Sequence, residues 1–264
     1  MADSFLQGDM KYIIGAYASA PSLKSNDKLL EAQFYNKLIK AIPQIHGLEI
    51  PFFGDDIHKF GSHFLLNILK PEWSNVLTCI PGVMMNLLKN PHFGLASNNN
   101  NGRVDAINMY KRANKNFHQI IDHFGDSSII AVQIVSAPSV PFKGVSSSKE
   151  SLMRSMDEIL KLDWKDAKIV IEHADLCGPD LIFEKGFLDL ESEIEVLSNL
   201  SSNHNVGIAI NWARSAIEGK NVDKPLEHIK LALKCKLLSG LIFSGTSEGD
   251  ANYGAWKDTH MPFA

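Results

Sequence analysis

Three ionisable side chains follow the apolar run in "KIVIEHADLCGP", residues 168–179: Glu172, His173 and Asp175. A buried carboxylate is costly unless a cation or a hydrogen-bond donor pairs with it, so these residues suggest either acid/base chemistry or a structural ion pair. Successive strand residues point to opposite faces, so only one of Glu172 and His173 can face a site. We predict that Glu172 faces the site, with an ion pair to Arg214 or a lysine as the alternative, and that His173 faces the helix layer.

Two other segments carry acids or bases that suit catalysis or metal binding. Glu49 is an isolated acid in the apolar run "GLEIPF", where desolvation would raise its pKa and favour proton transfer; a salt bridge toward a helix is the alternative. In "DTHMPF", Asp258 and His260 stand one residue apart, which could orient the imidazole or bind a divalent metal, and which also occurs in ordinary turns. Glu172, Glu49 and His260 are therefore the candidate catalytic residues.

Neutral and cationic polar residues lie in or just after other apolar runs. Amides and hydroxyls can hydrogen-bond the hydroxyl groups of a sugar, and an arginine can hold an anionic group such as phosphate. We predict that these residues bind the substrate: Tyr17, Gln133, Asn211, Arg214 and Ser244.

Seven short apolar, β-branched runs alternate with helical patterns, which is typical of an α/β protein with a parallel sheet. Most runs are apolar on both faces, as expected for strands covered by helices. The sequence thus predicts a TIM (β/α)8-type barrel and a single domain over residues 1–264. The predicted strands are residues 12–17, 47–52, 75–80, 128–135, 168–173, 206–211 and 240–245.

Two local patterns give further expectations. Leu30, Phe34 and Leu38 form a stripe that predicts the buried face of the first helix. The run "NNNNG", residues 98–102, predicts an exposed loop tip.

A closed barrel of this type needs eight strands, and seven are identified. Either one strand escapes the pattern, or the barrel is open or incomplete at its C-terminal end, or the natural chain continues beyond Ala264. An open edge would need a cover, such as a second copy in a homo-oligomer.

Composition argues against several partners and locations. The net charge is -4 without a lysine- or arginine-rich run, so no nucleic-acid partner is expected. The N-terminus lacks a signal-peptide pattern, no stretch reaches the roughly 18 apolar residues of a membrane helix, and three scattered cysteines do not form a disulfide framework. We expect a cytoplasmic protein without a membrane partner. Motifs for nucleotide phosphates and for serine hydrolases are absent.

The segments "GAYASAP", "IEHADLCGP", "INWARSAIEG", "FSGTS" and "DTHMPF" resemble a domain-of-unknown-function family. That family belongs to the xylose-isomerase-like TIM-barrel superfamily, which includes sugar-phosphate isomerases and epimerases and endonuclease-IV-type proteins. In the sugar epimerases, a glutamate, an aspartate, a histidine and a final glutamate hold a divalent metal. Glu172 matches the first glutamate and His260 the histidine, but Asn211 stands where the aspartate would be, and the final glutamate has no counterpart.

The resemblance implies a sugar or sugar-phosphate isomerase or epimerase. A divalent metal (Mn, Mg or Zn) would be held by Glu172, Asp258 and His260. Asn211 and the missing glutamate favour an alternative, a non-catalytic carbohydrate-binding or regulatory barrel without the metal set. A metal-dependent phosphodiesterase of the endonuclease-IV type is less favoured, because neither many strand-end ligands nor a basic groove is evident.

Overall fold

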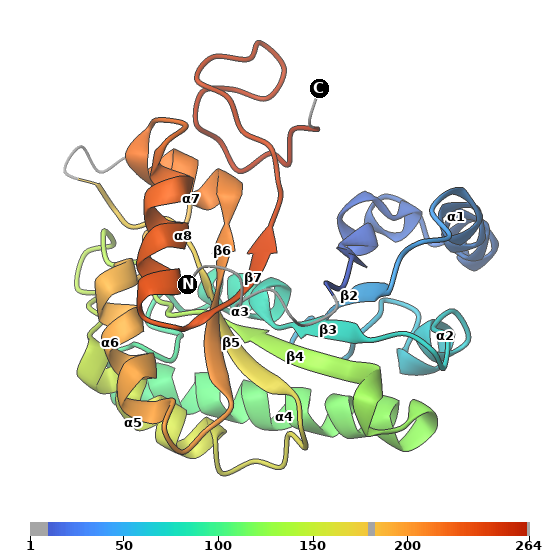
Figure 1. Ribbon diagram of the computed structural model, residues 1–264, viewed down its shortest axis with the longest axis horizontal. Helices are drawn as coiled ribbons and strands as arrows, with labels where there is room; N and C mark the ends of the chain where they lie inside the picture. The colour runs from blue at the N-terminus through green and yellow to red at the C-terminus, as the bar shows by residue number, and fades with distance from the viewer. Residues whose placement is uncertain (1–9, 179–182, 263–264) are drawn as a thin grey trace.

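Seven parallel strands lie side by side in chain order, from β1 to β7, in the computed structural model, which describes residues 10–178 and 183–262 (Figure 1). The sheet curls into a half-barrel with helices on its outer side. The strands are β1 (Ile13–Ile14), β2 (Gly47–Pro51), β3 (Asn75–Thr78), β4 (Ile129–Ile134), β5 (Lys168–His173), β6 (Val206–Asn211) and β7 (Leu238–Ile242).

The predicted strands are all present, and β5 and β6 have the predicted bounds. β1 is much shorter than predicted, because the chain turns at Gly15 and residues Ala16–Ser19 form a 3-10 helix, η1. Tyr17 therefore lies in that helical turn and not at a strand end. β7 starts two residues earlier than predicted and ends at Ile242.

The helices follow the strands along the chain and cover the convex side of the sheet (Figure 1). Side-chain caps begin α1, α4, α5 and α6, where an Asp, Asn or Ser oxygen accepts a backbone N–H of the first turn. The helices are α1 (Lys28–Ala41), α2 (Ser62–Leu66), α3 (Ile80–Leu87), α4 (Asn100–Phe124), α5 (Lys149–Ile159), α6 (Leu190–Leu200), α7 (Trp212–Gly219) and α8 (Lys224–Lys234), with the 3-10 turns η2 (Pro21–Leu23) and η3 (Asp126–Ser128).

One local expectation was wrong, and another was wrong in part. The "NNNNG" run starts α4 instead of forming a loop tip, because Asn99 caps the helix by accepting the N–H of Gly102 at 3.0 Å. In α1 the predicted stripe was wrong for Leu30, which is 44% exposed, whereas Phe34 and Leu38 pack against the core; the fully buried residues are Glu31 and Tyr35. The Glu31 carboxylate is held there by donors from Ser22 and by the ring of His58.

The parallel register gives the sheet two different faces. The outer face carries large aliphatic side chains, such as Leu77, Val132 and Ile171, which are fully buried against the helices. The inner face carries smaller and polar residues, with Gln133 in register with Thr78 and with Val170. The inner face also carries Val76, Ala131, Val170 and Ala209, so the expectation that most strands are apolar on both faces holds, with Thr78, Gln133 and Glu172 as polar exceptions.

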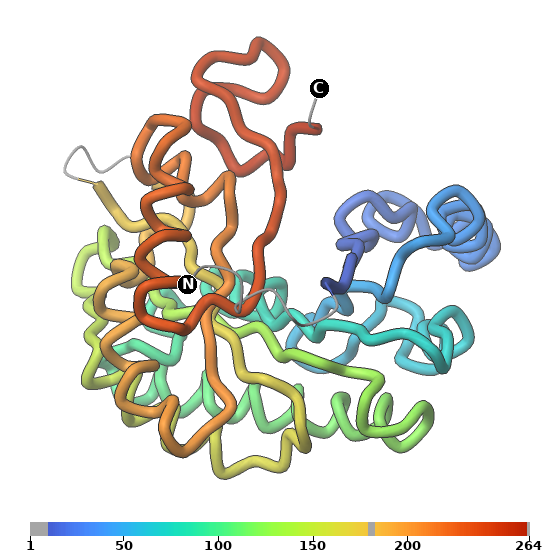
Figure 2. Tube along the Cα trace, viewed as in Figure 1, coloured from blue at the N-terminus to red at the C-terminus, as the bar shows by residue number. Residues whose placement is uncertain are grey.

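β1 and β7 are the two edges of the sheet of the described residues, so the barrel is open, which is one of the alternatives that the strand count left. Figure 2 shows the chain after β7 (red) continuing as an irregular segment that stands apart from the N-terminal elements (blue). Leu241 and Phe243, on the outer side at β7, are 43% and 63% exposed.

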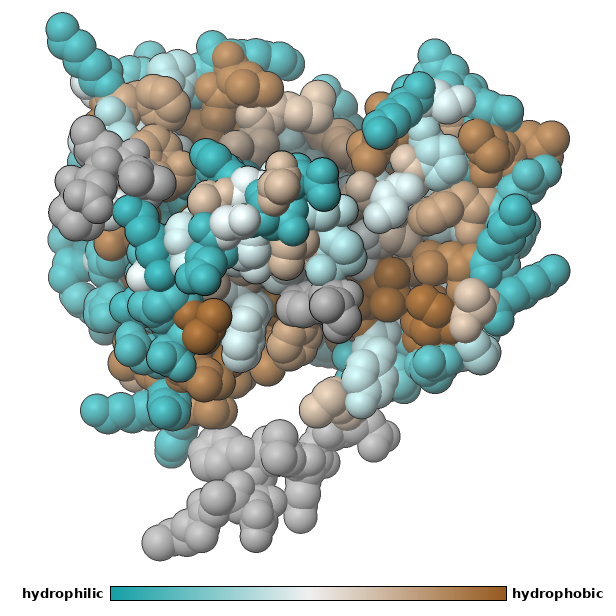
Figure 3. Space-filling model, turned by 90° about the horizontal axis from the view of Figure 1, so that it is seen from above, coloured by the Kyte–Doolittle hydropathy of each residue, from teal (hydrophilic) through white to brown (hydrophobic). Residues whose placement is uncertain are grey.

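A second exposed apolar area lies on the N-terminal elements, where Leu23 and Leu29 are 59% and 69% exposed. Seen from above, apolar side chains gather on that side of the molecule (Figure 3). Within the described residues, no helix has the length and apolar character needed to cross a membrane. All three cysteines are free thiols.

Asn75 ties three strands together at the start of the sheet. Its Oδ1 accepts the N–H of Leu48 at 2.9 Å, and its Nδ2 donates to the carbonyl of Ser128 at 3.0 Å, all in a buried position. Because Asn75→Ala leaves both backbone groups unsatisfied, at about 1–3 kcal/mol each, we expect the free energy of unfolding to fall by about 2 kcal/mol or more in urea titrations.

Asn67→Ala is the matched control, since the Asn67 amide bonds only locally on the surface to the carbonyl of His63. Equal stability losses for the two variants would contradict a role for Asn75 as the link between strands.

Candidate active site

Glu172, Asn211 and Ser244 form a hydrogen-bonded chain across the ends of β5, β6 and β7. Asn211 Nδ2 donates to Glu172 Oε1 at 2.9 Å, and Asn211 Oδ1 accepts the Ser244 hydroxyl at 2.9 Å. Glu172 is only 5% exposed. Burial raises the pKa of Glu172, although the Asn211 amide and the charge of Arg214 oppose the rise. Glu172 therefore places a carboxyl with a raised pKa on the inner face of the half-barrel, at a strand end as predicted.

Glu49 on β2 is an electrostatic neighbour of Glu172. Burial, and then the charge of Glu172, raises the pKa of Glu49 to about 8. A Cβ atom at Gly15 would stand 2.7 Å from a carboxylate oxygen of Glu49, so only glycine leaves room for this side chain. Glu49 thus faces inward, toward the other acid and not toward a helix. The site thus holds two inward-facing carboxyls whose pKa values are both raised, and that of Glu49 lies just above neutral pH.

Tyr17 and Gln133 supply neutral polar groups to the same interior. Burial, followed by the charges of Glu49 and Glu172, raises the pKa of Tyr17, so its phenol keeps its proton. Gln133 is buried, and its Oε1 has no hydrogen-bond partner in the described part of the chain; the same holds for the hydroxyl of its register neighbour Thr78. Buried polar atoms without a hydrogen-bond partner are uncommon. Here they lie on β3 and β4, between the strands that carry Glu49 and Glu172.

Arg214 meets acids on two sides. Its Nη2 pairs with Asp258 Oδ2, and its Nη1 lies 3.8 Å from Asp175 Oδ1. Lys185 Nζ also donates to Asp258 Oδ2, at 3.0 Å. Burial alone would raise the pKa of Asp258, but Arg214 and Lys185 lower it overall. Lys185 was not predicted as a site residue, since a lysine in a loop carries no sequence signal that distinguishes it from a surface lysine.

A second ion pair joins the loop that carries Lys185 to the C-terminal segment, and in this pair the loop supplies the acid and the C-terminal segment the lysine. Lys257 Nζ binds Glu184 Oε1 at 2.8 Å, beside the Lys185 and Asp258 pair. The two pairs link residues 73 positions apart and fix the rim of the site.

His260 does not join Glu172. Its side chain is 58% exposed, and its Nε2 lies 3.9 Å from Asp258 Oδ1. Within the residues that the structure describes, the possible ligand atoms of Glu172, Asp258 and His260 do not lie close enough together to share a metal ion. The donor chemistry agrees, because Asp258 is already neutralised by two cations and Asn211 replaces a carboxylate with a weaker ligand. This set does not fit a metal in the observed arrangement.

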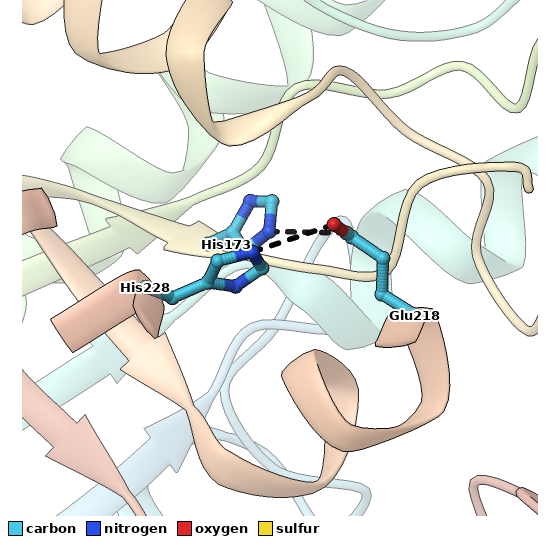
Figure 4. Close-up of side chains that lie close together, drawn as sticks. All are labelled: His173, Glu218 and His228. Carbon is cyan, nitrogen blue, oxygen red and sulfur yellow. Dashed lines mark ion pairs between the residues drawn. The ribbon is translucent and has the colours of Figure 1, made fainter. Parts of the chain in front are cut away.

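His173 faces the helix layer, where it lies beside Glu218 and His228 (Figure 4). Because it follows Glu172 directly in β5, the two side chains lie on opposite faces of the strand. Its Nδ1 lies 2.8 Å from Glu193 Oε2 on α6, and its Nε2 lies 3.3 Å from Glu218 Oε2 on α7. His228 on α8 approaches Glu218 Oε1 at 3.4 Å. Burial alone would lower the pKa of His173, but the two carboxylates raise it to about 10. The sequence pattern did not single out Glu193, Glu218 or His228, because each lies on a different helix.

The chain belongs to the family described as "Domain of unknown function (DUF4862)", whose model matches residues 13–264. It is 34% identical over 260 residues to the protein STM3670 of Salmonella typhimurium, covering 98% of this chain and 80% of that protein.

Several solved structures share the fold of this chain at low sequence identity. Endonuclease IV from Thermus thermophilus has a TM-score of 0.54 at 9% identity, over 95% of this chain and 80% of its own. The 3-keto-D-glucoside 4-epimerase YcjR from E. coli has a TM-score of 0.53 at 11% identity, over 88% of this chain and 76% of its own. The IolI protein, which carries a zinc atom, has a TM-score of 0.52 at 16% identity, over 88% and 72%.

The pKa of Glu49 gives a stability test with a defined sign. Because the folded pKa of about 8 lies above the ordinary value, the folded protein holds a proton that the unfolded chain has released. The free energy of unfolding should therefore fall as pH rises from about 5 to about 8, the window between the two pKa values, and then level off. Glu49→Gln should flatten this part of the profile, measured by urea unfolding across the range.

Glu72→Gln, which alters an exposed carboxylate, is the control and should leave the slope of the profile unchanged. A Glu49→Gln profile parallel to that of the unaltered protein would show that the pKa of Glu49 is not raised.

Proposed function

We propose that the chain is a sugar isomerase or epimerase that moves a proton at a carbon next to a carbonyl group. The observation that carries the proposal is the electrostatically coupled pair Glu49 and Glu172, two inward-facing carboxyls with raised pKa values. Groups of this kind suit general acid/base catalysis near neutral pH. One neighbour, the 3-keto-D-glucoside 4-epimerase, shares the fold and supports the choice of substrate class by analogy.

Each carboxyl has a defined task in this chemistry. Glu172, as carboxylate, accepts the proton from the carbon beside the carbonyl, and the C–H electron pair forms the enediolate. Glu49, which carries a proton near neutral pH, returns a proton to the carbon and becomes the carboxylate. Delivery to the opposite face inverts that carbon. The Tyr17 phenol, held protonated, donates to the developing enediolate oxygen.

The polar residues around the pair bind the rest of the sugar in this proposal. Gln133, Asn211 and Ser244 hydrogen-bond hydroxyl groups, and Arg214 with Lys185 attracts an anionic substituent. A hollow of about 320 Å³ begins at Ser244 and is lined by Trp212 and Trp256, whose rings can pack against the apolar face of a sugar. Since Glu172, Asp258 and His260 do not converge, no step requires a metal.

A second candidate is a carbohydrate-binding barrel without catalysis. Two observations favour a binding barrel. Asp258 is already paired with both Arg214 and Lys185, and Asn211 stands where the related enzymes have an acid. Both candidates take a small-molecule sugar and neither requires nucleic acid. They differ only in whether a C–H bond is broken.

Exchange of substrate hydrogen for solvent deuterium separates the two candidates. With a panel of keto sugars and their phosphates in D2O, we expect loss of a C–H signal by NMR with the unaltered protein. Glu172→Gln should reduce the exchange rate by about 10²- to 10⁴-fold. The rate should also fall as pH rises through about 8, where Glu49 loses its proton.

Glu195→Gln, an exposed site on α6, is the matched control. Full exchange in Glu172→Gln would exclude Glu172 as the base. Sugar binding detected by calorimetry, without exchange at any pH, would establish the binding barrel instead.

A further inference from the structure

A second polar cluster lies outside the half-barrel, between β5 and the helix layer. Its members are His173 at the end of β5, Glu218 in the last turn of α7 and His228 in α8 (Figure 4). His173 is fully buried and His228 is 4% exposed. Because neighbouring residues of a strand face opposite ways, this cluster is separated from Glu172 by the sheet itself. The chemistry proposed for the inner face does not use it.

The spacing of the three side chains matches that of metal ligands. His173 Nε2 lies 3.3 Å from Glu218 Oε2, and His228 Nε2 lies 3.4 Å from Glu218 Oε1. One ligand atom from each residue falls within 4.8 Å of the others. In a tetrahedral zinc site, with bonds of about 2.0–2.1 Å, neighbouring ligand atoms stand about 3.3 Å apart. Small side-chain movements are therefore enough to form the site.

The other nitrogen of each ring already has a partner. His173 Nδ1 lies 2.8 Å from Glu193 Oε2, and His228 Nδ1 lies 2.9 Å from Ser215 Oγ. Such outer contacts orient the imidazoles of metal sites and leave Nε2 as the ligand atom. Glu193 is itself anchored by the hydroxyl of Ser136.

An independent observation points into the cluster. His173 Nε2 is buried and lacks a hydrogen bond of acceptable geometry among the described residues, although the Glu218 carboxylate is near. The charges also suit a divalent cation, since the carboxylates of Glu193 and Glu218 would be balanced by one ion bound to two neutral imidazoles. Two imidazoles and one carboxylate favour zinc over magnesium or calcium, which prefer oxygen ligands.

We propose that His173, Glu218 and His228 bind a zinc ion that joins β5 to α7 and α8. The ion would also secure the chain after β5, because Glu218 Oε2 accepts the N–H of Leu176 at 2.9 Å. Since His173 follows Glu172 directly, zinc binding would stabilise the strand end that carries the inward acid. The site is structural, and it stands whether or not the barrel catalyses a reaction on sugars.

Metal content and thermal unfolding test the site. Untagged protein, stripped with chelator and dialysed against Zn²⁺, should retain one zinc per chain and unfold at a higher temperature than the stripped protein. His228→Gln should lose both the zinc and the temperature shift. His204→Gln, an exposed histidine, is the matched control and should keep both. Glu193→Gln should weaken zinc affinity by about 10- to 100-fold.

Two further variants keep the test decisive if His228→Gln folds poorly. His228→Cys supplies another zinc ligand and should restore binding, and its Co²⁺ form should show the visible absorption of a tetrahedral site. Glu172→Gln should still bind zinc. The proposal would be overturned if the unaltered protein bound no zinc or if His228→Gln retained zinc. It would also be overturned if zinc were lost in Glu172→Gln but not in His228→Gln.

Discussion

The alternation of side chains along β5 is the constraint on which both polar clusters depend. Glu172 and His173 are adjacent in the chain, yet one faces the interior of the half-barrel and the other the helix layer. Each face therefore has to satisfy its own buried charge. The inner face does so with an amide from β6 and with cations from α7 and from the loop after β5, whereas the outer face uses carboxylates and a second imidazole from three helices. One strand end thus fixes the positions of elements on both sides of the sheet.

The open barrel explains why acids are tolerated on the inner face. A closed barrel of this type fills its interior with layers of branched aliphatic side chains, which leave no room for unpaired carboxyls. Here the large aliphatic side chains of the strands lie on the outer face, and the interior holds small and polar residues such as Thr78 and Gln133. Burial raises the pKa of Glu49 and Glu172, and the amide of Asn211 and the charges of Arg214 and Lys185 oppose the rise at Glu172.

The sequence predicted the features that depend on local pattern. β5 and β6 have the predicted bounds, and Glu172 faces inward because period-two alternation is a property of the strand alone. In α1 the prediction held for Phe34 and Leu38 but not for Leu30, because the neighbouring Glu31 is buried instead and contacts His58 from another part of the chain. Pairs such as Lys185 with Asp258 join residues far apart in the chain, so they depend on the tertiary fold. The histidine and glutamate cluster is invisible in the sequence for the same reason.

The ion pairs of Asp258 affect the charge of the sugar that the proposed site could bind. Arg214 and Lys185 already share this carboxylate, so a sugar phosphate would have to displace Asp258 before it could use either cation. Displacement would also break the Lys185–Asp258 pair, one of the two ion pairs that hold the C-terminal segment to the loop after β5. A neutral keto sugar needs only the amides, hydroxyls and carboxyls of the interior and leaves the rim intact. In the proposed function, Asp258 therefore competes with an anionic substituent of the substrate for Arg214 and Lys185.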